Sequence, residues 1–479
     1  MDQIHDPNFP LHDLEVHRRQ INRMRRVSTM WNNFLLSSPR YWQVLSIKSP
    51  PPTITAGIKR SGSGPLCIYC IRSLPQPVPN QLLELVWCAT RVQTLRSDDP
   101  DAHHICRVLL RTPTSTLQTL QLIVPRHLER SIEPLRDLSV AARIRHLTAV
   151  GWRPPSRGAV WLMGLKELVL HDLSQLDAET LLVLSACVNL ERLVIQCFSK
   201  SHVEGPSGVP STITLPCLQV MDLIFGSGES ARSLIRRLVT PRLLRSSLDV
   251  GESALETGHR ADYCRFMSQG EECAQYPKSA SIRIETVRLA YTRVVYETES
   301  RRFAYERFNS QNQAQTFHDL VQEFQGLLQE PALTVTAIDS STRIRSDDIW
   351  LFLKSIGDQN VRTIEALLNG QEADGLLVAI GAPSNRTDAL ATNTTTDPSF
   401  ESLKSIAINN AKLDLARLTG LVETWQRHLQ RMSKRWLEEV DLVGCRVREM
   451  GLGEAINRLR AIEVTLRCVR CFDFEETWF

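Results

Sequence analysis

Two Cys-x-x-Cys pairs are the residues whose type and spacing best suit metal chemistry. One pair is Cys67 and Cys70, and the other is Cys468 and Cys471. Four thiolates from two such pairs could hold one zinc ion in tetrahedral geometry. The pairs lie near opposite ends of the sequence, however, and each falls in a run of alternating apolar residues, where a buried cysteine behaves as a small hydrophobic residue. We therefore expect buried thiols rather than a zinc site or a redox dithiol.

Other residues with catalytic potential lack the neighbours that chemistry needs. His103 and His104 have no carboxylate or cysteine nearby at metal-ligand spacing. The two Gly-Ser-Gly segments that begin at Gly62 and Gly226 lack the lysine of a phosphate-binding loop, and neither completes a Gly-x-Ser-x-Gly nucleophile elbow. The sequence therefore predicts turns at these segments, no catalytic residue, no cofactor and a protein that is not an enzyme.

The charge of the chain is almost balanced. It has 56 Lys and Arg residues against 53 Asp and Glu residues, so the formal net charge at pH 7 is only +3. Such a balance gives no overall attraction to nucleic acid or to an anionic membrane, and we expect neither as a partner. An arginine cluster would also fit a nuclear address or a phosphate contact, but a solvated helix side is the simpler interpretation. Its members are Arg18, Arg19, Arg23, Arg25 and Arg26.

The sequence predicts a cytoplasmic or nuclear location, or both. Met1 to Pro10 lack the basic start and apolar run of a secretory signal. The apolar runs are also much shorter than the roughly 20 residues that cross a bilayer. In a reducing compartment the 12 cysteines stay unpaired. The glycosylation sequons at Asn385 and Asn393 are then chance matches in a polar loop.

One apolar pattern recurs along the chain: an apolar residue, two variable residues, an apolar residue, one variable residue and an apolar residue. Such a unit describes a short strand with one apolar edge, and repetition every 20 to 29 residues is typical of leucine-rich repeats. The nine copies are Leu117-Leu120-Leu122, Ile144-Leu147-Ala149, Leu165-Leu168-Leu170, Leu190-Leu193-Ile195, Leu218-Met221-Leu223, Ile284-Val287-Leu289, Leu403-Ile406-Ile408, Leu437-Val440-Leu442 and Leu459-Ile462-Val464.

The predicted fold class is α/β: a leucine-rich-repeat solenoid with parallel strands on the concave face and helices on the convex face. A helix from Asp177, its N-cap, to Val188 fits one return segment. Wide gaps precede the copies at Ile284 and Leu403, and Leu333-Val335-Ala337 with the helical-looking segment 347–356 fits a degenerate unit there. Cys445 occupies a position where leucine-rich repeats often place Asn or Cys. The alternative is an ordinary α/β domain with scattered amphipathic strands.

The N-terminal section has the pattern of a bent helix pair. Apolar residues recur at three- and four-residue steps from about Val16 to Leu36, which predicts one helix. Ser38 suits an N-cap and Pro39 a first helical position, so a second short helix should follow through Trp42. A low-order proline segment, 49–55, then separates this section from the rest.

The stretch from Val27 to Trp42, Val-Ser-Thr-Met-Trp-Asn-Asn-Phe-Leu-Leu-Ser-Ser-Pro-Arg-Tyr-Trp, resembles the second half of the F-box-like domain of large fungal families. The segment Ile58-Lys-Arg-Ser-Gly-Ser-Gly-Pro-Leu66 is similar to a further motif of those families. Their opening Leu-Pro-x-Glu-Leu/Ile-Leu helix has no counterpart before residue 21, so the front half of the domain is truncated. The resemblance implies an adaptor-binding surface at Val27, Trp31, Leu35, Pro39 and Trp42.

The resemblance implies a non-catalytic substrate receptor. Its N-terminal helices would dock on the linker subunit of a cullin-RING (SCF-type) ubiquitin ligase, and its repeats would hold an unidentified protein substrate. The alternative is a free-standing repeat scaffold whose F-box remnant no longer docks and only caps the solenoid. Exposed Trp31 and Trp42 side chains favour docking, whereas burial of both favours capping.

The pleat of the strands predicts the partner surface. If Leu168 and Leu170 point into the core, their neighbours on the strand point out onto the concave face. The same count on the next two strands gives a contiguous patch that mixes aliphatic residues with both signs of charge, which suits a protein or peptide. The predicted patch is Glu167, Val169, His171, Arg192, Val194, Gln196, Val220, Asp222 and Ile224.

These observations divide the chain into five parts. They are an F-box-like helical segment at 1–48, a linker with the first strand at 49–80, a first repeat block at 81–250, a polar loop at 251–280, and a second repeat block at 281–479 that a polar loop interrupts at 381–398.

Overall fold

The computed structural model divides into two compact units. Unit 1 comprises Met1–Ser246 with Gln269–Glu271, and unit 2 comprises Ser247–Ser268 with Glu272–Phe479. The structure describes residues 11–47, 49–70, 88–98, 116–124, 143–154, 160–173, 175–198, 210–251, 280–288, 291–298, 301–308, 333–339, 361–367, 403–409, 411–431, 437–448, 452–469 and 472–473. The helical-looking segment 347–356, the loop 381–398 and nearly all of the loop 251–280 lie outside these residues.

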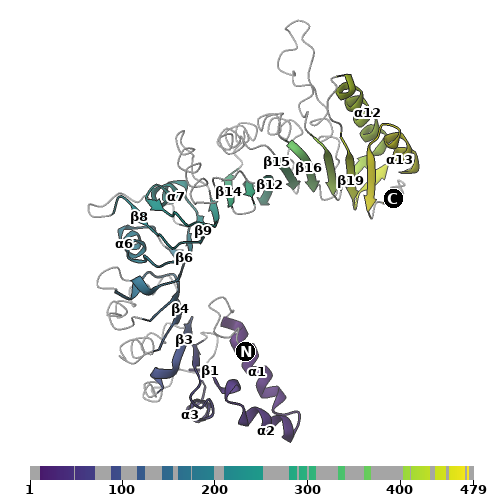
Figure 1. Cartoon of the computed structure of the whole chain (residues 1–479). Coiled ribbons are helices and arrows are strands. Elements are labelled where there is room, and N and C mark those ends of the chain that lie inside the picture. The colour runs from purple at the N-terminus through teal and green to yellow at the C-terminus, as the bar shows by residue number, and fades with distance from the viewer. Residues whose placement is uncertain are drawn as a thin grey trace. The chain divides into compact units, whose positions relative to one another are not determined.

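A ladder of parallel strands forms the frame of unit 1 (Figure 1). Each strand pairs with the next one in the series. The strands are β1 (Val44–Ser46), β2 (Leu66–Cys70), β3 (Val92–Ser97), β4 (Thr119–Ile123), β5 (His146–Val150), β6 (Glu167–Leu173), β7 (Arg192–Cys197) and β9 (Val220–Phe225).

The apolar residues of the repeated pattern stack in register along this ladder. Leu147 pairs with Leu168, Leu168 with Leu193 and Leu193 with Met221. All four are fully buried. Each strand thus completes the apolar edge of its neighbour, as a stacked repeat requires. The predicted leucine-rich-repeat solenoid is confirmed, and so are the strands of the first five copies.

The segments that connect successive strands of the ladder lie on one side of it and are partly helical. Figure 1 shows α6 (Ala178–Ala186) and α7 (Gly228–Ile235) on this side, with α1 on the opposite side. As predicted, Asp177 caps α6, since its Oδ1 accepts a hydrogen bond from the Thr180 backbone N at 3.0 Å. The same side has the 3-10 helix η6 (Val160–Gly164) and the short parallel pair β8 (Ile213–Thr214) and β10 (Leu238–Val239). Another 3-10 turn, η3 (Ala89–Arg91), precedes β3.

The N-terminal helix is broken where the sequence predicted one continuous helix from Val16 to Leu36. Two helices occur instead, α1 (Leu11–Met24) and α2 (Thr29–Ser37). The Ser28 Oγ accepts a hydrogen bond from the Trp31 backbone N at 3.2 Å and caps α2. Serine favours such caps over helix interiors, which explains the break. The short second helix is present as η2 (Pro39–Trp42).

The segment expected to be a proline linker is a helix, α3 (Pro51–Arg60). Its prolines occupy the first helical turn, where a missing N–H is harmless and the fixed φ angle suits a helix. Arg91 fastens the far end of α3, because its Nε donates to the Gly64 carbonyl at 3.1 Å and its guanidinium also contacts the Ser61 hydroxyl.

Unit 2 combines an antiparallel segment with a second parallel ladder. β12 (Ala280–Arg288), β13 (Tyr291–Thr298) and β14 (Arg301–Phe308) pair antiparallel in succession, which the sequence did not reveal. β12 then pairs in parallel with β15 (Leu333–Asp339), the strand of the degenerate unit. The ladder continues through β16 (Val361–Leu367), β17 (Ser405–Asn409), β19 (Glu439–Val443) and β21 (Thr465–Val469). β11 (Arg245–Val250) spans the boundary of the two units.

The last repeat copy, Leu459-Ile462-Val464, was assigned wrongly. Leu459 lies in helix α13 (Leu452–Arg460), and a turn follows it. The strand begins later, so that Leu466 rather than Ile462 pairs with Val440. Leu459 is buried on the inner face of α13 together with Ala455, and its distance to Ile462 in the following turn and to Val464 matched the repeat pattern by chance.

Cys445 takes the place that the sequence suggested. It is fully buried, and its thiol donates to the Ile408 carbonyl of the preceding repeat at 3.2 Å. A small parallel sheet lies next to it, with β18 (Lys412–Asp414), β20 (Arg446–Arg448) and β22 (Phe472–Asp473).

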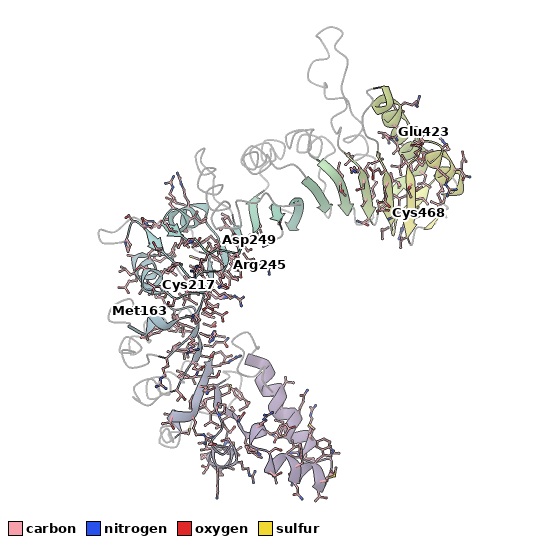
Figure 2. All side chains as sticks on the ribbon, in the orientation of Figure 1. Met163, Cys217, Arg245, Asp249, Glu423 and Cys468 are labelled. Carbon is pink, nitrogen blue, oxygen red and sulfur yellow. The ribbon has the colours of Figure 1, made fainter. Side chains whose placement is uncertain are left out.

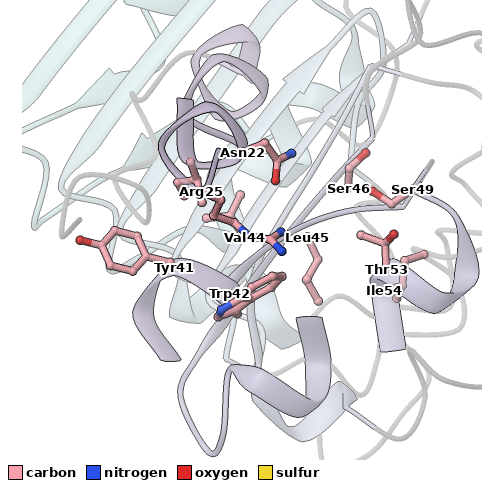
Figure 3. A pocket seen from close by; sticks show the side chains of 11 residues that line it. Asn22, Arg25, Tyr41, Trp42, Val44, Leu45, Ser46, Ser49, Thr53 and Ile54 are labelled. Carbon is pink, nitrogen blue, oxygen red and sulfur yellow. The ribbon is translucent and has the colours of Figure 1, made fainter. Parts of the chain in front are cut away.

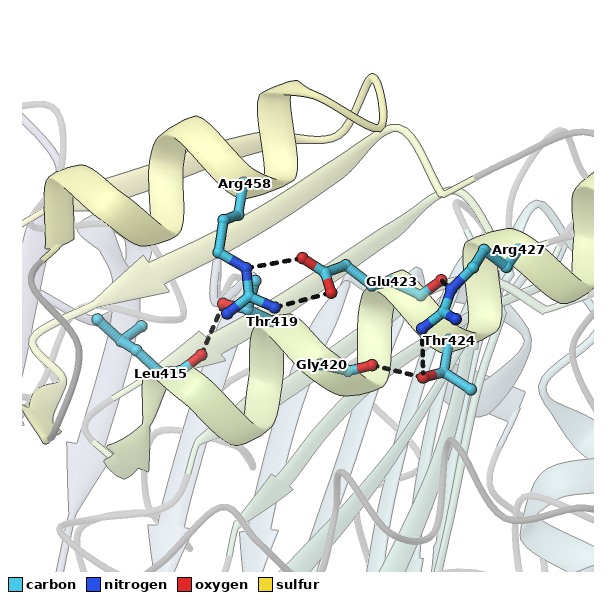
Figure 4. A network of polar contacts seen from close by, with 7 residues as sticks. All are labelled: Leu415, Thr419, Gly420, Glu423, Thr424, Arg427 and Arg458. Atoms are coloured by element: carbon cyan, nitrogen blue, oxygen red, sulfur yellow. Dashed lines mark hydrogen bonds and ion pairs between the residues drawn. The ribbon is translucent and has the colours of Figure 1, made fainter.

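Two helices cover the C-terminal repeats, α13 and α12 (Leu415–Arg431). A bidentate ion pair joins them, with Arg458 Nε and Nη2 at 2.8 and 2.7 Å from the two Glu423 carboxylate oxygens (Figure 4). Hydrogen bonding to Glu423 raises the pKa of Arg458. Paired guanidinium and carboxylate groups of this kind also fix the angle between helices.

We predict that Leu193→Ala lowers the free energy of unfolding by about 2–5 kcal/mol, through lost burial and a residual cavity. Stability in a stacked array passes between neighbours, so amide protection should also fall around Leu168 and Met221. Urea unfolding and hydrogen exchange measure the two effects. Val239→Ala, at a residue that is 36% exposed, is the matched control and should change stability little. Unchanged protection at the two neighbouring strands would contradict a cooperative ladder.

Candidate functional site

The nine residues of the predicted partner patch lie on adjacent strands of unit 1, in register across the ladder. Glu167 pairs with Arg192 and Arg192 with Val220, which makes a first row. A second row is Val169, Val194 and Asp222, and Gln196 pairs with Ile224 in a third. The patch is therefore contiguous, as the pleat predicted.

A chain of charges crosses the first row. Glu167 lies between two basic side chains, with its Oε2 at 3.2 Å from the His146 Nδ1 and its Oε1 at 3.2 Å from the Arg192 Nη1. The second contact lacks hydrogen-bond geometry and is an ion pair only. The Arg192 Nη2 also reaches the Asp222 Oδ2 at 4.0 Å. The patch predicted from the sequence does not include His146, because it starts at β6 and His146 lies on β5.

Exposure varies within the patch. Glu167 is 7% exposed, and Val169 and Val194 are both 9% exposed, so these three form its floor. The other six are half-buried. His171 is held by Gln196, whose Oε1 lies 2.7 Å from the His171 Nδ1. The surface thus offers a shallow floor, apolar at Val169 and Val194, with polar groups already oriented around it. Figure 2 shows the side chains of the described residues on the ribbon.

The same face is closed at the first strands. Tyr69 and Arg96 occupy the second row on β2 and β3, yet both are fully buried. Cys67 in the first row is also fully buried, and burial raises the pKa of its thiol to about 12. Such a thiol stays protonated and neither reacts nor binds metal readily. Access to the face is therefore limited to later strands.

An exposed apolar cluster lies on α2 and the residue before its cap. Val27 is 71%, Met30 72%, Trp31 37% and Phe34 50% exposed. The Phe34 ring meets Trp31 and Tyr41 edge to face, with ring centroids 6.0 Å apart in each case. Met30 was missed by the sequence analysis, although its spacing from Val27 and Phe34 matches one helix face.

The remaining residues of the predicted adaptor surface have different environments. Leu35 is fully buried, whereas Pro39 is exposed at the start of η2. Trp42 is half-buried, and its indole N–H donates to the Leu35 carbonyl at 2.9 Å. The structure therefore splits the predicted set: Val27, Trp31 and Pro39 face solvent, while Leu35 and Trp42 hold the segment together.

The candidate metal ligands are not brought together in the described residues. Cys70 is buried next to Cys67 on β2, while Cys468 lies on β21 in unit 2. Cys471 falls outside the described residues, as does the His103-His104 pair. Within the described ranges no group of three or more potential ligands occurs. No helix among them is long and apolar enough to cross a membrane.

Comparisons with known proteins add little to this geometry. No family model matches the sequence, and no curated protein matches it significantly. A solved structure of a leucine-rich-repeat protein from Leptospira interrogans aligns with 91% of this chain and 97% of its own, at 11% identity and a TM-score of 0.32. The fold assignment rests on the strand register and the buried stack described above.

We predict that Arg192→Met lowers the free energy of unfolding by about 1–3 kcal/mol, because it leaves the buried Glu167 carboxylate short of a partner. Glu167→Gln should remove part of that cost, so the double variant should lose less than the sum of the two single variants. Urea unfolding of the wild type and the three variants measures this coupling. Strictly additive losses would mean that the two side chains do not interact.

Proposed function

We propose that this protein is a non-catalytic substrate receptor of a cullin-RING ubiquitin ligase, acting in the cytoplasm or nucleus. In this proposal the N-terminal helices dock on the ligase's linker subunit. The concave face of unit 1 holds a protein target, and the chain itself performs no bond chemistry.

The observation that carries the docking half is the exposed cluster of Val27, Met30, Trp31 and Phe34. Large apolar side chains at this exposure are costly to leave in water, and clusters of them commonly form contact surfaces. Aromatic residues also tend to dominate interface energy. The cluster lies within the stretch that resembles the fungal F-box-like domain, which supports the linker subunit as its partner.

The concave patch supports the second half of the proposal. Leucine-rich repeats present a rigid strand surface, and repeat proteins commonly bind other proteins there. The patch has an apolar floor at Val169 and Val194, and its charges are of both signs. A folded protein or peptide fits such a surface better than nucleic acid does, since nucleic acid needs dense positive charge.

A specific observation favours the second candidate, a free-standing scaffold. Leu35 is fully buried, and Trp42 is half-buried and donates to the Leu35 carbonyl, which is what a segment that only caps the repeat core would require. The two candidates make opposite statements about Trp31 and Phe34, because capping requires no partner for these exposed rings.

We predict that Trp31→Ala combined with Phe34→Ala weakens binding of the purified linker subunit by at least about 30-fold, the equivalent of about 2 kcal/mol. Thermal stability should change little, since both side chains are exposed. Trp42→Ala should instead lower thermal stability through its lost indole bond. Calorimetric titration measures the affinity, and Met163→Ala, at a residue 51% exposed in η6, is the control. A wild-type chain that does not bind the linker subunit would leave only the scaffold candidate.

We also predict that Val220→Glu with Ile224→Glu abolishes retention of the main target without unfolding the protein. Both residues are half-buried on β9, so a carboxylate at either position can reach water while it disrupts an apolar contact. Affinity purification of the variant, of the wild type and of a Met163→Glu control compares the retained proteins. Equal retention by all three would place the target site outside the concave patch.

A further inference from the structure

A cavity lies where the N-terminal helices meet the first repeat. Its volume is about 70 Å³, and side chains from α1, η2, β1 and the start of α3 surround it (Figure 3). Since a water molecule needs roughly 10–15 Å³ of such space, the cavity has room for a group of about five heavy atoms. The polar side chains that line it include Asn22, Arg25, Ser46, Ser49 and Thr53.

One of these side chains is buried with an unsatisfied hydroxyl. Ser46 is only 2% exposed, and its Oγ has no hydrogen-bond partner. Ser49 is 5% exposed and lies close to Ser46, because its backbone N donates to the Ser46 carbonyl at 3.1 Å. Buried hydroxyl groups nearly always have a partner in a folded protein. The Ser46 hydroxyl is therefore available to a group that enters the cavity.

Two guanidinium groups lie at or near the cavity. Arg25 lines it, and the guanidinium carbons of Arg25 and Arg60 lie 5.4 and 4.6 Å from the centre of the Trp42 ring. Arg25 uses its Nε for Asn32 Oδ1 at 3.1 Å, a bond that does not engage the fork of Nη groups. From Val16 to Cys70 the sequence contains nine Lys or Arg residues and no Asp or Glu. This stretch is therefore basic within a nearly neutral chain.

Hydroxyl groups at the start of α3 supply further donors. Ser49 and Thr53 stand at the N-terminal end of that helix, which runs from Pro51 to Arg60. Backbone amides add none here, because the prolines lack an N–H and the Thr53 N–H donates to the Pro50 carbonyl. Hydroxyl donors and one guanidinium therefore surround a small space whose lining includes no carboxylate.

We infer that this cavity binds a tetrahedral oxyanion, a phosphate ion or the phosphoryl group of a small phosphate ester. The room available matches the five heavy atoms of phosphate. A guanidinium group and several hydroxyl groups are the donors that phosphate oxygens prefer. The inference does not depend on the ligase role, because the residues that line the cavity and those of the exposed cluster are different.

Binding there would connect α1 to β1 and α3. A ligand that binds only the folded state stabilises it in proportion to the logarithm of its concentration. Phosphate should therefore raise the thermal midpoint of the full chain, and it should do so beyond the effect of chloride at equal ionic strength.

Calorimetric titration of the full-length protein with inorganic phosphate tests the inference. Arg25→Gln should weaken binding at least tenfold, whereas Arg25→Lys, which keeps the charge, should lose less. The matched control is Arg26→Gln. Arg26 is exposed and does not line the cavity, and this substitution removes the same charge one residue away. Its affinity for phosphate should stay within twofold of the wild type.

Ser46→Ala gives a second readout that a structural role alone would not move. The unbonded hydroxyl makes no stabilising hydrogen bond in the empty protein, so the variant should be at least as stable as the wild type without phosphate. It should nevertheless bind phosphate severalfold more weakly. Unchanged phosphate affinity in this variant, or equal losses in Arg25→Gln and Arg26→Gln, would overturn the inference, as would a wild-type protein that binds no phosphate.

Titration with phosphoserine distinguishes the sources of the anion. Affinity equal to or above that of phosphate assigns the cavity to a phosphate ester, and much weaker affinity assigns it to the free ion. For either assignment, Arg25→Gln must weaken the binding of whichever ligand, phosphate or phosphoserine, binds more tightly. Binding of phosphoserine that survives Arg25→Gln unchanged would place that ligand outside the cavity and contradict the inference for esters.

Discussion

The whole molecule depends on in-register parallel stacking of strands that cannot bury their own apolar edges. Leu147, Leu168, Leu193 and Met221 form one continuous buried row because each fills the space beside the next. A stack of this kind always leaves an unfinished first strand. In unit 1 that strand is β1, which contacts α1 and α3, and Ile54 of α3 is buried there.

The same register dictates how charges are arranged on the strands. Side chains at equivalent positions of parallel neighbours lie only about 5 Å apart, so like charges in one row would repel. Opposite charges occur instead: Glu167 faces Arg192, Lys166 faces Glu191, and in unit 2 Lys404 faces Glu438. The Lys166–Glu191 and Lys404–Glu438 pairs are exposed, and each contributes little to stability. The Glu167 carboxylate is buried, so its contact with Arg192 matters more and holds both side chains of the patch in fixed positions.

The sequence was informative where one period repeats and uninformative where a local signal competes with it. The five regular copies predicted five strands, their core residues and the outward patch, because a period of two determines both faces of a strand. Leu459 misled the assignment, because a buried leucine near the end of α13 stands three residues before Ile462, the spacing that the pattern requires. The prolines at 50–52 led to a predicted linker where α3 begins, because prolines in a first helical turn and prolines in a linker look alike in sequence. The antiparallel strands β13 and β14 carry no copy of the pattern, and the cavity beside β1 depends on packing between segments that no local pattern relates.

The break at residues 25–28 connects the structural and functional parts of the N-terminal segment. In a continuous helix Arg25 and Trp31 would have a fixed orientation relative to each other. Ser28 instead starts a new helix, so that Arg25 lies over the Trp42 ring beside the cavity while Trp31 and Phe34 remain in solvent. Trp42 links the two sides, because its indole N–H bonds to the Leu35 carbonyl at the base of the exposed helix. An anion held by Arg25 would restrain that joint and therefore the direction in which α2 presents its apolar cluster. The cationic Arg25 beside the cavity and the apolar cluster on α2 are thus structurally connected through Trp42.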